Sequence, residues 1–339
     1  MRVGIVGTGA IARLHARAYR HLGFSVRAVV DVIPAAANAF VAEHGGEVMA
    51  DAEALCRHPE IDYVDVCTLP NVRLPIVELC AKYSKHVQVQ KPIATTVADA
   101  RRMIDVAAAA GIRLGVVSQH RFDDASRFVY AAIQSGRLGR ILQCDAYVKW
   151  YRTDDYYSRP GKGTWEVEGG GALINQAIHQ VDLLRWFMGP VHDVCGTWQL
   201  GAAHQIESED NLSALLQFAN GATGVIQAST AIWPGYPERI ELHGTKGTAI
   251  ITGDLLTTWD VLNDDGPAPP MSKSAASGAS DPMAISLKPF EDQFLDFADA
   301  IRAGRTPSVS GHDGLLALEV VDAIYRSCRT GQRQTVGEA

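Results

Sequence analysis

The fold is decided by the stretch Arg2-Val3-Gly4-Ile5-Val6-Gly7-Thr8-Gly9-Ala10-Ile11-Ala12 and by an acid, Asp31, that closes the next apolar run. The apolar residues before the glycines predict a strand, and the residues from Ala10 to about Leu22 predict a helix. Gly7 permits a tight turn, Gly9 lets the backbone approach a pyrophosphate, and the small Ala12 lets the helix pack close to the sheet. The pattern is therefore a dinucleotide-binding fingerprint in its proper strand–turn–helix context.

The kind of dinucleotide follows from Asp31. This residue comes directly after the run Val26-Arg27-Ala28-Val29-Val30. A carboxylate there can accept hydrogen bonds from both adenosine ribose hydroxyls and repel a 2′-phosphate, so it favours NAD over NADP as the cofactor. FAD uses the same fingerprint, and it is the less favoured alternative because the sequence shows no further flavin signal.

The bulk properties exclude several classes of protein. The chain has 339 residues, of which 47% are apolar, so we expect two domains. Its net charge is −7, and we expect no nucleic-acid or membrane partner, because binding to either requires a basic patch. No apolar run reaches the roughly 18 residues of a membrane-spanning helix. The N-terminus has no signal-peptide pattern, so we expect a cytoplasmic protein. The six cysteines lack CxxC spacing, and we expect no metal site.

Residues 1–120 alternate between strand and helix patterns. Such alternation predicts an α/β domain with a doubly wound parallel sheet, a Rossmann-type domain that binds NAD. In sheets of this kind the ligand lies beyond the carboxyl ends of the strands. These ends fall at residues 7–11, 31, 68–71, 90–92 and 118–121.

Residues 121–339 follow a different pattern. A long strand, Ile141–Trp150, and a helix, Ala172–Met188, precede several short strands, which predicts a substrate-binding α+β domain with an open, mostly antiparallel sheet. A helix must cover one sheet face, and we expect a second copy on the other, giving a homodimer or homotetramer. The C-terminal helix, residues 314–328, is a candidate to pack back on the first domain. Residues 264–281 are rich in Pro, Ala, Gly and Ser and predict a surface loop.

Two short segments carry residues suited to chemistry. Lys91, in Val89-Gln90-Lys91-Pro92, follows a parallel strand and could donate to a substrate oxygen; the alternative is a solvent-exposed lysine. Three glycines at residues 169–171 precede Asn175 and His179, which are four residues apart and so share one helical face. A histidine can take the proton of an alcohol, although a structural histidine at a domain interface is the alternative. A metal held by His179 and Asp182 would need further ligands, which we do not identify.

These motifs together resemble the Gfo/Idh/MocA family, the glucose–fructose oxidoreductase and inositol dehydrogenase group. The resemblance covers nearly the whole chain. It implies that Lys91 orients and polarises the reacting oxygen, that His179 acts as acid or base, and that both line a cleft over the nicotinamide. The expected cofactor contacts are Gly7, Thr8, Gly9, Ala10, Ile11, Asp31, Leu69, Pro70, Asn71, Gln90 and Lys91.

Two residues depart from the family pattern. Gln90 stands where the family usually has glutamate, and Asn175 stands where inositol dehydrogenases have aspartate. The asparagine form resembles members that act on sugar nucleotides or glycosides at the 3-hydroxyl. Asn175 is an expected substrate contact, because an amide can hydrogen-bond a sugar hydroxyl. Arg121, Tyr151 and Trp165 are also expected substrate contacts, with packing or surface roles as the alternative for these three.

The sequence therefore predicts an NAD-dependent dehydrogenase that oxidises a secondary hydroxyl of a sugar, glycoside, sugar nucleotide or cyclitol. A keto-sugar reductase, a trans-dihydrodiol dehydrogenase of the same family and a non-catalytic NAD(H) sensor are the alternatives. A sensor would need neither Lys91 nor His179.

Overall fold

The computed structural model describes residues 1–270 and 286–337. The chain divides into two compact units: Met1–Gln119 with Ser286–Leu315, and His120–Ile285 with Leu316–Ala339. This division differs from the expected domain of residues 121–339, because residues 286–315 belong to the first unit. Most of the loop expected at residues 264–281 lies outside the described residues.

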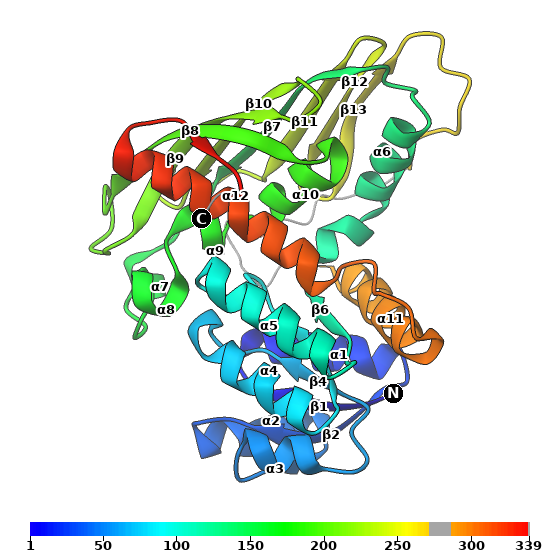
Figure 1. The fold of residues 1–339 in the computed structure, drawn as a ribbon, viewed down its shortest axis with the longest axis vertical. Coiled ribbons are helices and arrows are strands. Elements are labelled where there is room, and N and C mark those ends of the chain that lie inside the picture. The colour runs from blue at the N-terminus through cyan, green and yellow to red at the C-terminus, as the bar shows by residue number, and fades with distance from the viewer. Residues whose placement is uncertain (271–285, 338–339) are drawn as a thin grey trace. The chain divides into compact units, whose positions relative to one another are not determined.

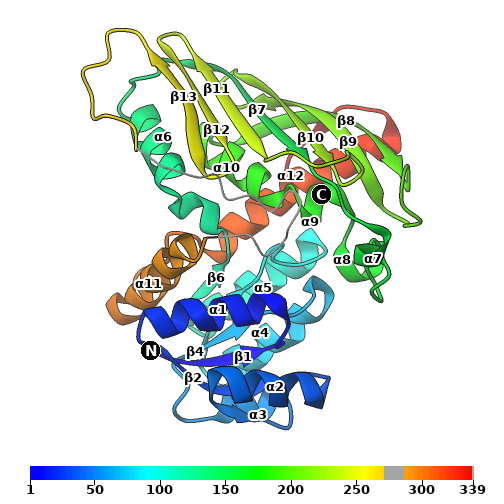
Figure 2. The ribbon, with the colours of Figure 1, turned by 180° about the vertical axis from the view of Figure 1, so that it is seen from behind.

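The first unit is built on a six-stranded sheet in the order β3-β2-β1-β4-β5-β6. All five strand pairs are parallel. Helices α4 and α5 lie over one face (Figure 1), and α1 lies over the other (Figure 2). Since both faces are covered, most residues of the central strands are apolar and buried, with Asp65 on β4 and Gln88 on β5 as buried polar exceptions. The fully buried Ala12 lets α1 lie close to the sheet.

The strand order of this sheet reverses between β1 and β4, which is where open α/β sheets bind ligands. The elements of the unit are β1 (Arg2–Val6), α1 (Ala10–His21), β2 (Ser25–Val30), α2 (Pro34–His44), β3 (Glu47–Val48), α3 (Ala52–Arg57), β4 (Tyr63–Val66), η1 (Pro70–Val72), α4 (Arg73–Lys82), β5 (His86–Val89), α5 (Val97–Ala109), β6 (Leu114–Val116) and α11 (Lys288–Ala303). Helix α12 (Gly311–Thr330) begins here and continues into the second unit.

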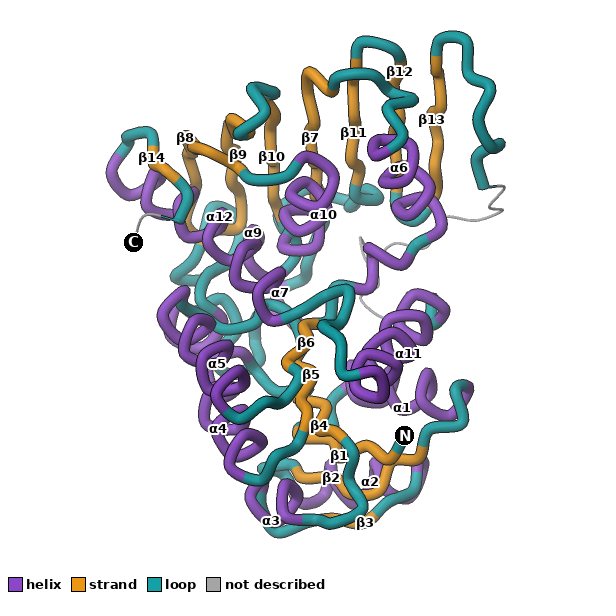
Figure 3. The backbone as a smooth tube through the Cα atoms, turned by 45° about the vertical axis from the view of Figure 1, so that its right-hand side comes forward, coloured by secondary structure: helices purple, strands orange, loops and turns teal. Residues whose placement is uncertain are grey.

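The second unit is built on an eight-stranded sheet in the order β13-β12-β11-β7-β10-β9-β8-β14. Its pairs are antiparallel except for β10 and β7, which run parallel. Figure 3 shows the strands side by side, with α6 and α10 on one face of the sheet. The elements are η2 (Gln119–Phe122), α6 (Asp124–Gln134), β7 (Ile141–Lys149), α7 (Asp154–Tyr157), α8 (Trp165–Glu168), α9 (Ala172–Asn175), α10 (Ile178–Met188), β8 (Val191–Leu200), β9 (Glu209–Phe218), β10 (Thr223–Ser229), β11 (Arg239–Gly244), β12 (Gly247–Thr252), β13 (Leu255–Val261) and β14 (Gln334–Thr335).

The predicted fold class is confirmed, but the single helix expected over Ala172–Met188 is wrong. The chain forms two helices, α9 and α10, separated by Gln176 and Ala177. The amide of Ala177 donates to the carbonyl of Ala172, five residues back, so the regular helical ladder is interrupted there. Asn175 and His179 are therefore not on one face of a regular helix.

Within residues 1–270 and 286–337, no helix combines the length and the apolar content needed to cross a membrane.

Candidate active site

The glycine turn leaves the N-terminus of α1 open to a ligand. Gly7 has φ +88°, and a Cβ there would lie 3.2 Å from the carbonyl carbon of Cys67. Gly9 caps α1, and no heavy atom of the described residues lies within 4 Å of the position that a Cβ would take. The unpaired amides and the positive end of this 12-residue helix suit an anion such as a pyrophosphate.

Asp31 lies directly after β2 and is tied to the same turn. One carboxylate oxygen accepts hydrogen bonds from the Thr8 amide at 2.7 Å and the Thr8 hydroxyl at 2.8 Å. The other accepts from the Ile33 amide at 2.9 Å. Partial burial works against ionisation of Asp31, but these hydrogen bonds outweigh it and lower its pKa. The ionised carboxylate is half-exposed, as an acceptor for ribose hydroxyls must be.

Two exposed apolar side chains after Asp31 escaped the sequence reasoning. Val32 is 97% exposed and Ile33 is 60% exposed. Exposed apolar side chains beside the ribose acid offer an apolar surface on which the flat face of an adenine could lie. The signal was present in the sequence, as two apolar residues directly after the predicted ribose acid.

The remaining expected cofactor contacts follow β4 and β5. Leu69 and Asn71 are exposed, whereas Pro70 is buried at the start of the short turn η1. Lys91 is half-buried and lies two residues after the end of β5. Gln90 is also an expected cofactor contact. Its side chain is 6% exposed, and its amide group lies against the His15 ring inside the first unit.

In the second unit, two of the three glycines before α9, Gly170 and Gly171, are required by the close approach of other residues. Gly170 has φ +149°, and a Cβ there would lie 2.3 Å from the Tyr325 hydroxyl oxygen. A Cβ on Gly171 would lie 1.8 Å from the backbone oxygen of Glu209. The Glu209 side chain accepts hydrogen bonds from the amides of Gly171 and Leu173 at 2.9 and 2.8 Å. Burial raises the pKa of Glu209 to about 7 in spite of these hydrogen bonds.

His179, the expected acid or base, lies beside a second histidine that the sequence reasoning missed. His179 is 9% exposed, and its ring packs edge-to-face with that of His120 at a centroid distance of 4.9 Å. His120 Nδ1 lies 2.7 Å from a carboxylate oxygen of Asp123. Burial lowers the pKa of His120, but Asp123 outweighs it and raises the pKa to about 8. His120 and Asp123 are thus a charged but overall neutral pair next to His179.

Asn175 is half-buried and holds the glycine segment. Its side-chain amide donates to the carbonyl oxygens of Gly170 at 2.9 Å and of Gly171 at 3.3 Å. The residue therefore acts as a hydrogen-bond donor, a role that an ionised aspartate could not fill.

Arg121 and Trp165 have packing contacts. Arg121 is 8% exposed and forms a two-pronged ion pair with Asp182, with Arg121 Nε 2.7 Å from one carboxylate oxygen. Trp165 packs against Trp198 and Tyr325 at centroid distances of 5.5 and 5.1 Å. These contacts are the ones that the packing alternative predicts for the two residues.

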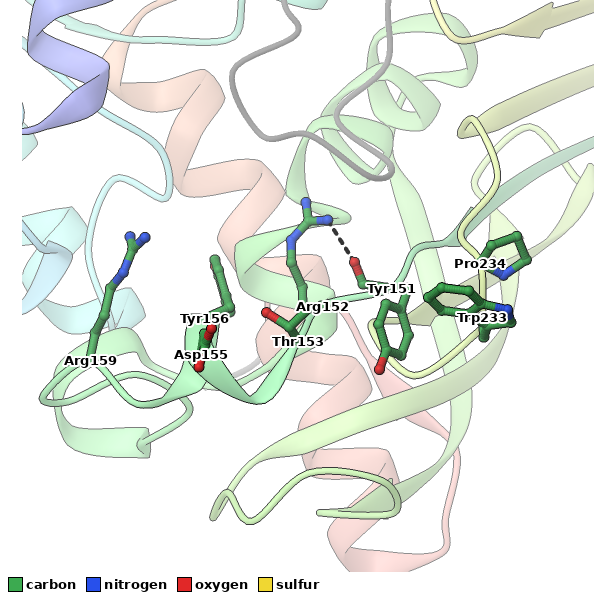
Figure 4. Close-up of a pocket in the computed structure, with 8 residues that line it drawn as sticks. All are labelled: Tyr151, Arg152, Thr153, Asp155, Tyr156, Arg159, Trp233 and Pro234. Carbon is green, nitrogen blue, oxygen red and sulfur yellow. Dashed lines mark hydrogen bonds between the residues drawn. The ribbon is translucent and has the colours of Figure 1, made fainter.

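Tyr151, by contrast, lines a pocket of about 540 Å³ in the second unit. Its ring lies edge-to-face with Trp233 at a centroid distance of 5.1 Å, and Figure 4 shows these two rings at one end of the pocket and Arg159 at the other. The Gln176 amide donates to the Tyr156 hydroxyl at 3.0 Å, so the pocket wall is joined to the residue after Asn175. The lining residues are Tyr151, Arg152, Thr153, Asp155, Tyr156, Arg159, Trp233 and Pro234.

Both units match models of one protein family. Residues 1–118 match the oxidoreductase family model with an NAD-binding Rossmann fold, and residues 127–250 match the GFO/IDH/MocA C-terminal domain. The chain is 28% identical over 330 residues to myo-inositol 2-dehydrogenase of Thermotoga maritima, covering 94% of this chain and 93% of that protein.

Solved structures agree with this assignment. The WlbA dehydrogenase from Bordetella pertussis, in complex with NADH and UDP-GlcNAcA, is 29% identical with a TM-score of 0.88, over 100% of this chain and 99% of that one. Levoglucosan dehydrogenase, in complex with NADH and levoglucosan, shares the fold at 21% identity and a TM-score of 0.88, with full coverage of both chains. The chain belongs to the Gfo/Idh/MocA family, and it is an NAD-binding oxidoreductase that acts on CH–OH groups.

Proposed function

We propose that this protein oxidises a secondary hydroxyl of a glycoside or sugar nucleotide, with NAD as the hydride acceptor. The observation that carries the choice of substrate class is the pocket beside Tyr151 and Trp233. Its volume of about 540 Å³ lies within the range of ligand pockets. Aromatic faces suit the C–H face of a sugar ring, and Arg152 and Arg159 suit an anionic group.

The residues of the two units have separate roles in this proposal. In the first unit, the N-terminus of α1 and Asp31 would bind the pyrophosphate and the adenosine ribose, and Val32 and Ile33 would cover the adenine. Bound NAD supplies the acceptor for the hydride. Lys91 would donate a hydrogen bond to the reacting oxygen, which favours the charge that develops on it as the proton leaves.

His179 would take that proton as the general base. The reaction balances when the carbinol carbon loses a hydride to the cofactor and the hydroxyl loses its proton to His179. In the reverse direction, protonated His179 would return the proton to the carbonyl oxygen, as a keto-sugar reductase requires.

A substrate panel tests the proposal. The protein would be mixed with NAD and pyranosides, cyclitols or UDP-sugars while the absorbance of reduced cofactor is followed. We expect turnover of a substituted sugar. Turnover of unsubstituted cyclitols alone would contradict the substrate class, and binding of NADH with no turnover across the panel in either direction would favour the sensor alternative.

Two aromatic variants sharpen the test. Trp233→Ala should lower kcat/KM for the substituted sugar roughly 3- to 10-fold by removing the stacked ring. Tyr236→Ala is the matched control, because Tyr236 is 55% exposed on the same segment but does not line the pocket. Equal losses in both variants would place the substrate elsewhere.

We also propose that the protein forms a homodimer or homotetramer through the face of the second sheet opposite α10. Leu142 and Leu215 are 43% and 58% exposed on the strands of this sheet. Analytical ultracentrifugation of the protein and of a Leu215→Asp variant tests the proposal, because a charge in an interface should dissociate it.

A further inference from the structure

A chain of buried hydrogen bonds in the first unit ends at the backbone of Lys91. Asp65 on β4 is fully buried, and one of its carboxylate oxygens lies 2.7 Å from both the Tyr19 hydroxyl and His15 Nδ1. The other ring nitrogen of His15 lies 2.8 Å from Gln90 Nε2. Gln90 Oε1 in turn accepts a hydrogen bond from the Lys91 amide at 3.2 Å. This series of hydrogen bonds links β4, α1 and the residue after β5, all in one compact unit, to the expected catalytic lysine.

The backbone amide of Lys91 determines which group donates and which accepts in every hydrogen bond of this series. A backbone N–H can only donate, so Gln90 must present its oxygen to Lys91 and its NH₂ to His15. His15 Nε2 must then accept, which leaves the single proton of the neutral ring on Nδ1. That proton points at the Asp65 carboxylate, which accepts it together with the Tyr19 hydroxyl proton. One arrangement of protons is consistent with all of these hydrogen bonds, and the second carboxylate oxygen of Asp65 has no hydrogen-bond partner among the described residues.

Arg73 holds the same backbone from the other side. It is 2% exposed and donates to the carbonyl oxygens of Gln90 and Pro92, which flank Lys91, and to that of Thr68. Burial lowers the pKa of Arg73 to about 9, so the guanidinium remains charged at neutral pH, and the Asp65 carboxylate partly compensates it. The backbone of Lys91 is therefore fixed at its own amide and at both neighbouring carbonyls.

We propose that Asp65, His15 and Gln90 are positioning residues that set the backbone, and through it the ammonium group, of Lys91 for the reaction. The proposal rests on the proposed function for the role of Lys91. A glutamine at position 90 fits this arrangement, because its NH₂ donates to His15 Nε2 while its oxygen accepts from the Lys91 amide, whereas an ionised glutamate would require a proton on His15 Nε2.

The same groups resemble a metal-ligand set, and the hydrogen-bond order argues against that reading. One ligand atom each of His15, Asp65 and Cys67 lies within 4.8 Å of the others. A metal would need the Nδ1 lone pair and the Cys67 thiolate. The proton of His15 occupies Nδ1, and burial raises the pKa of the Cys67 thiol well above its ordinary value.

Three variants test the proposal. Gln90→Met removes both side-chain hydrogen bonds at similar volume. His15→Asn keeps an amide nitrogen near the place of Nδ1, to donate to Asp65, but is too short to reach Gln90. Gln88→Met is the matched control, because Gln88 is a fully buried glutamine on β5 whose amide atoms form no hydrogen bond with the described residues.

Three measurements follow the chain from end to end. Nitrogen NMR of ¹⁵N-histidine-labelled protein should show His15 protonated on Nδ1 alone. Exchange of the Lys91 amide hydrogen should become at least about tenfold faster in Gln90→Met and in His15→Asn, and stay unchanged in Gln88→Met. With the substrate found by the panel, kcat should fall roughly 10- to 100-fold in the first two variants at unchanged NADH affinity. The double variant should be no worse than the more affected single one.

Several results would overturn the proposal. One is an NMR spectrum that places the proton on His15 Nε2. Another is a change of amide exchange or kcat in Gln88→Met equal to that in Gln90→Met. The others are unchanged amide exchange and kcat in Gln90→Met, and losses of kcat that multiply in the double variant. If no substrate of the panel is turned over, the proposed function fails, while the NMR and exchange measurements still decide whether the chain holds Lys91.

Discussion

The pair His120–Asp123 gives the protein a pH-dependent stability that Asp123→Asn should remove. The two side chains are 18% and 6% exposed, and Nδ1 and the carboxylate oxygen are 2.7 Å apart. Burial lowers the pKa of His120, but Asp123 raises it from 6.5 to about 8. Because the pKa is higher in the folded state, the stabilisation is fully present below about pH 6.5 and is lost as the pH rises through about 8.

The size of the effect follows from the same values. A rise of the His120 pKa from 6.5 to about 8 corresponds to about 2 kcal/mol. Burial raises the pKa of Asp123 by more than the contact with His120 lowers it. The cost of burying this carboxylate therefore offsets part of the stabilisation that the ion pair gives. We therefore expect Asp123→Asn to lower the free energy of unfolding by about 1–2 kcal/mol at pH 6, and by much less at pH 9.

Urea unfolding of both proteins at these two pH values measures the effect. Asp123 stands at the N-cap position of α6, but its side chain makes no capping hydrogen bond, so the substitution removes no helix cap. Asp124→Asn is the control, because Asp124 is an exposed carboxylate in the first turn of the same helix. An equal loss of stability at both pH values in Asp123→Asn would refute the reasoning, since a structural defect does not depend on the protonation of His120.

Three further predictions concern the site itself. Asp31→Ser should weaken NADH binding roughly 10- to 100-fold and leave NADPH binding unchanged or stronger, as measured by calorimetric titration; equal affinity of the unmodified protein for both would contradict the role of Asp31. Lys91→Ala and His179→Ala should each lower kcat by about 10²-fold or more at unchanged NADH affinity, and normal turnover by either variant would remove that residue from the mechanism. Asn175→Asp should lower the free energy of unfolding by about 1–3 kcal/mol at neutral pH, because the carboxylate would face the Gly170 carbonyl; unchanged urea stability would show that Asn175 is not needed as a donor.

The Rossmann fold of the first unit and its NAD cofactor could be predicted because their determinants are local in sequence. Gly7, Gly9 and Ala12 act through their own backbone and their own helix, and Asp31 lies one strand further on. The alternation of strands and helices then fixes which strand ends meet at one edge of the sheet. These features depend on spacing alone, and spacing is visible in a sequence.

The candidate site residues of the second unit depend on contacts between residues that are distant in sequence. Glu209 holds the Gly171 segment from β9, and Asp123 sets the charge of His120 beside His179. The helix break at Gln176 and Ala177 has no glycine or proline to mark it. Arg121 has the residue type of a substrate contact, and its partner Asp182 became evident only when the fold brought them together.

The two amides that replace family acids have one physical explanation. Gln90 donates to His15 Nε2, and Asn175 donates to the carbonyl oxygens of Gly170 and Gly171. An ionised acid at position 175 would place a charged oxygen against the Gly170 carbonyl oxygen, and one at position 90 would require a proton on His15 Nε2. Both substitutions are therefore explained by the immediate neighbours of the side chain. It follows that neither amide by itself indicates a change in reaction chemistry, and that the substrate is better inferred from the pocket beside Tyr151 and Trp233.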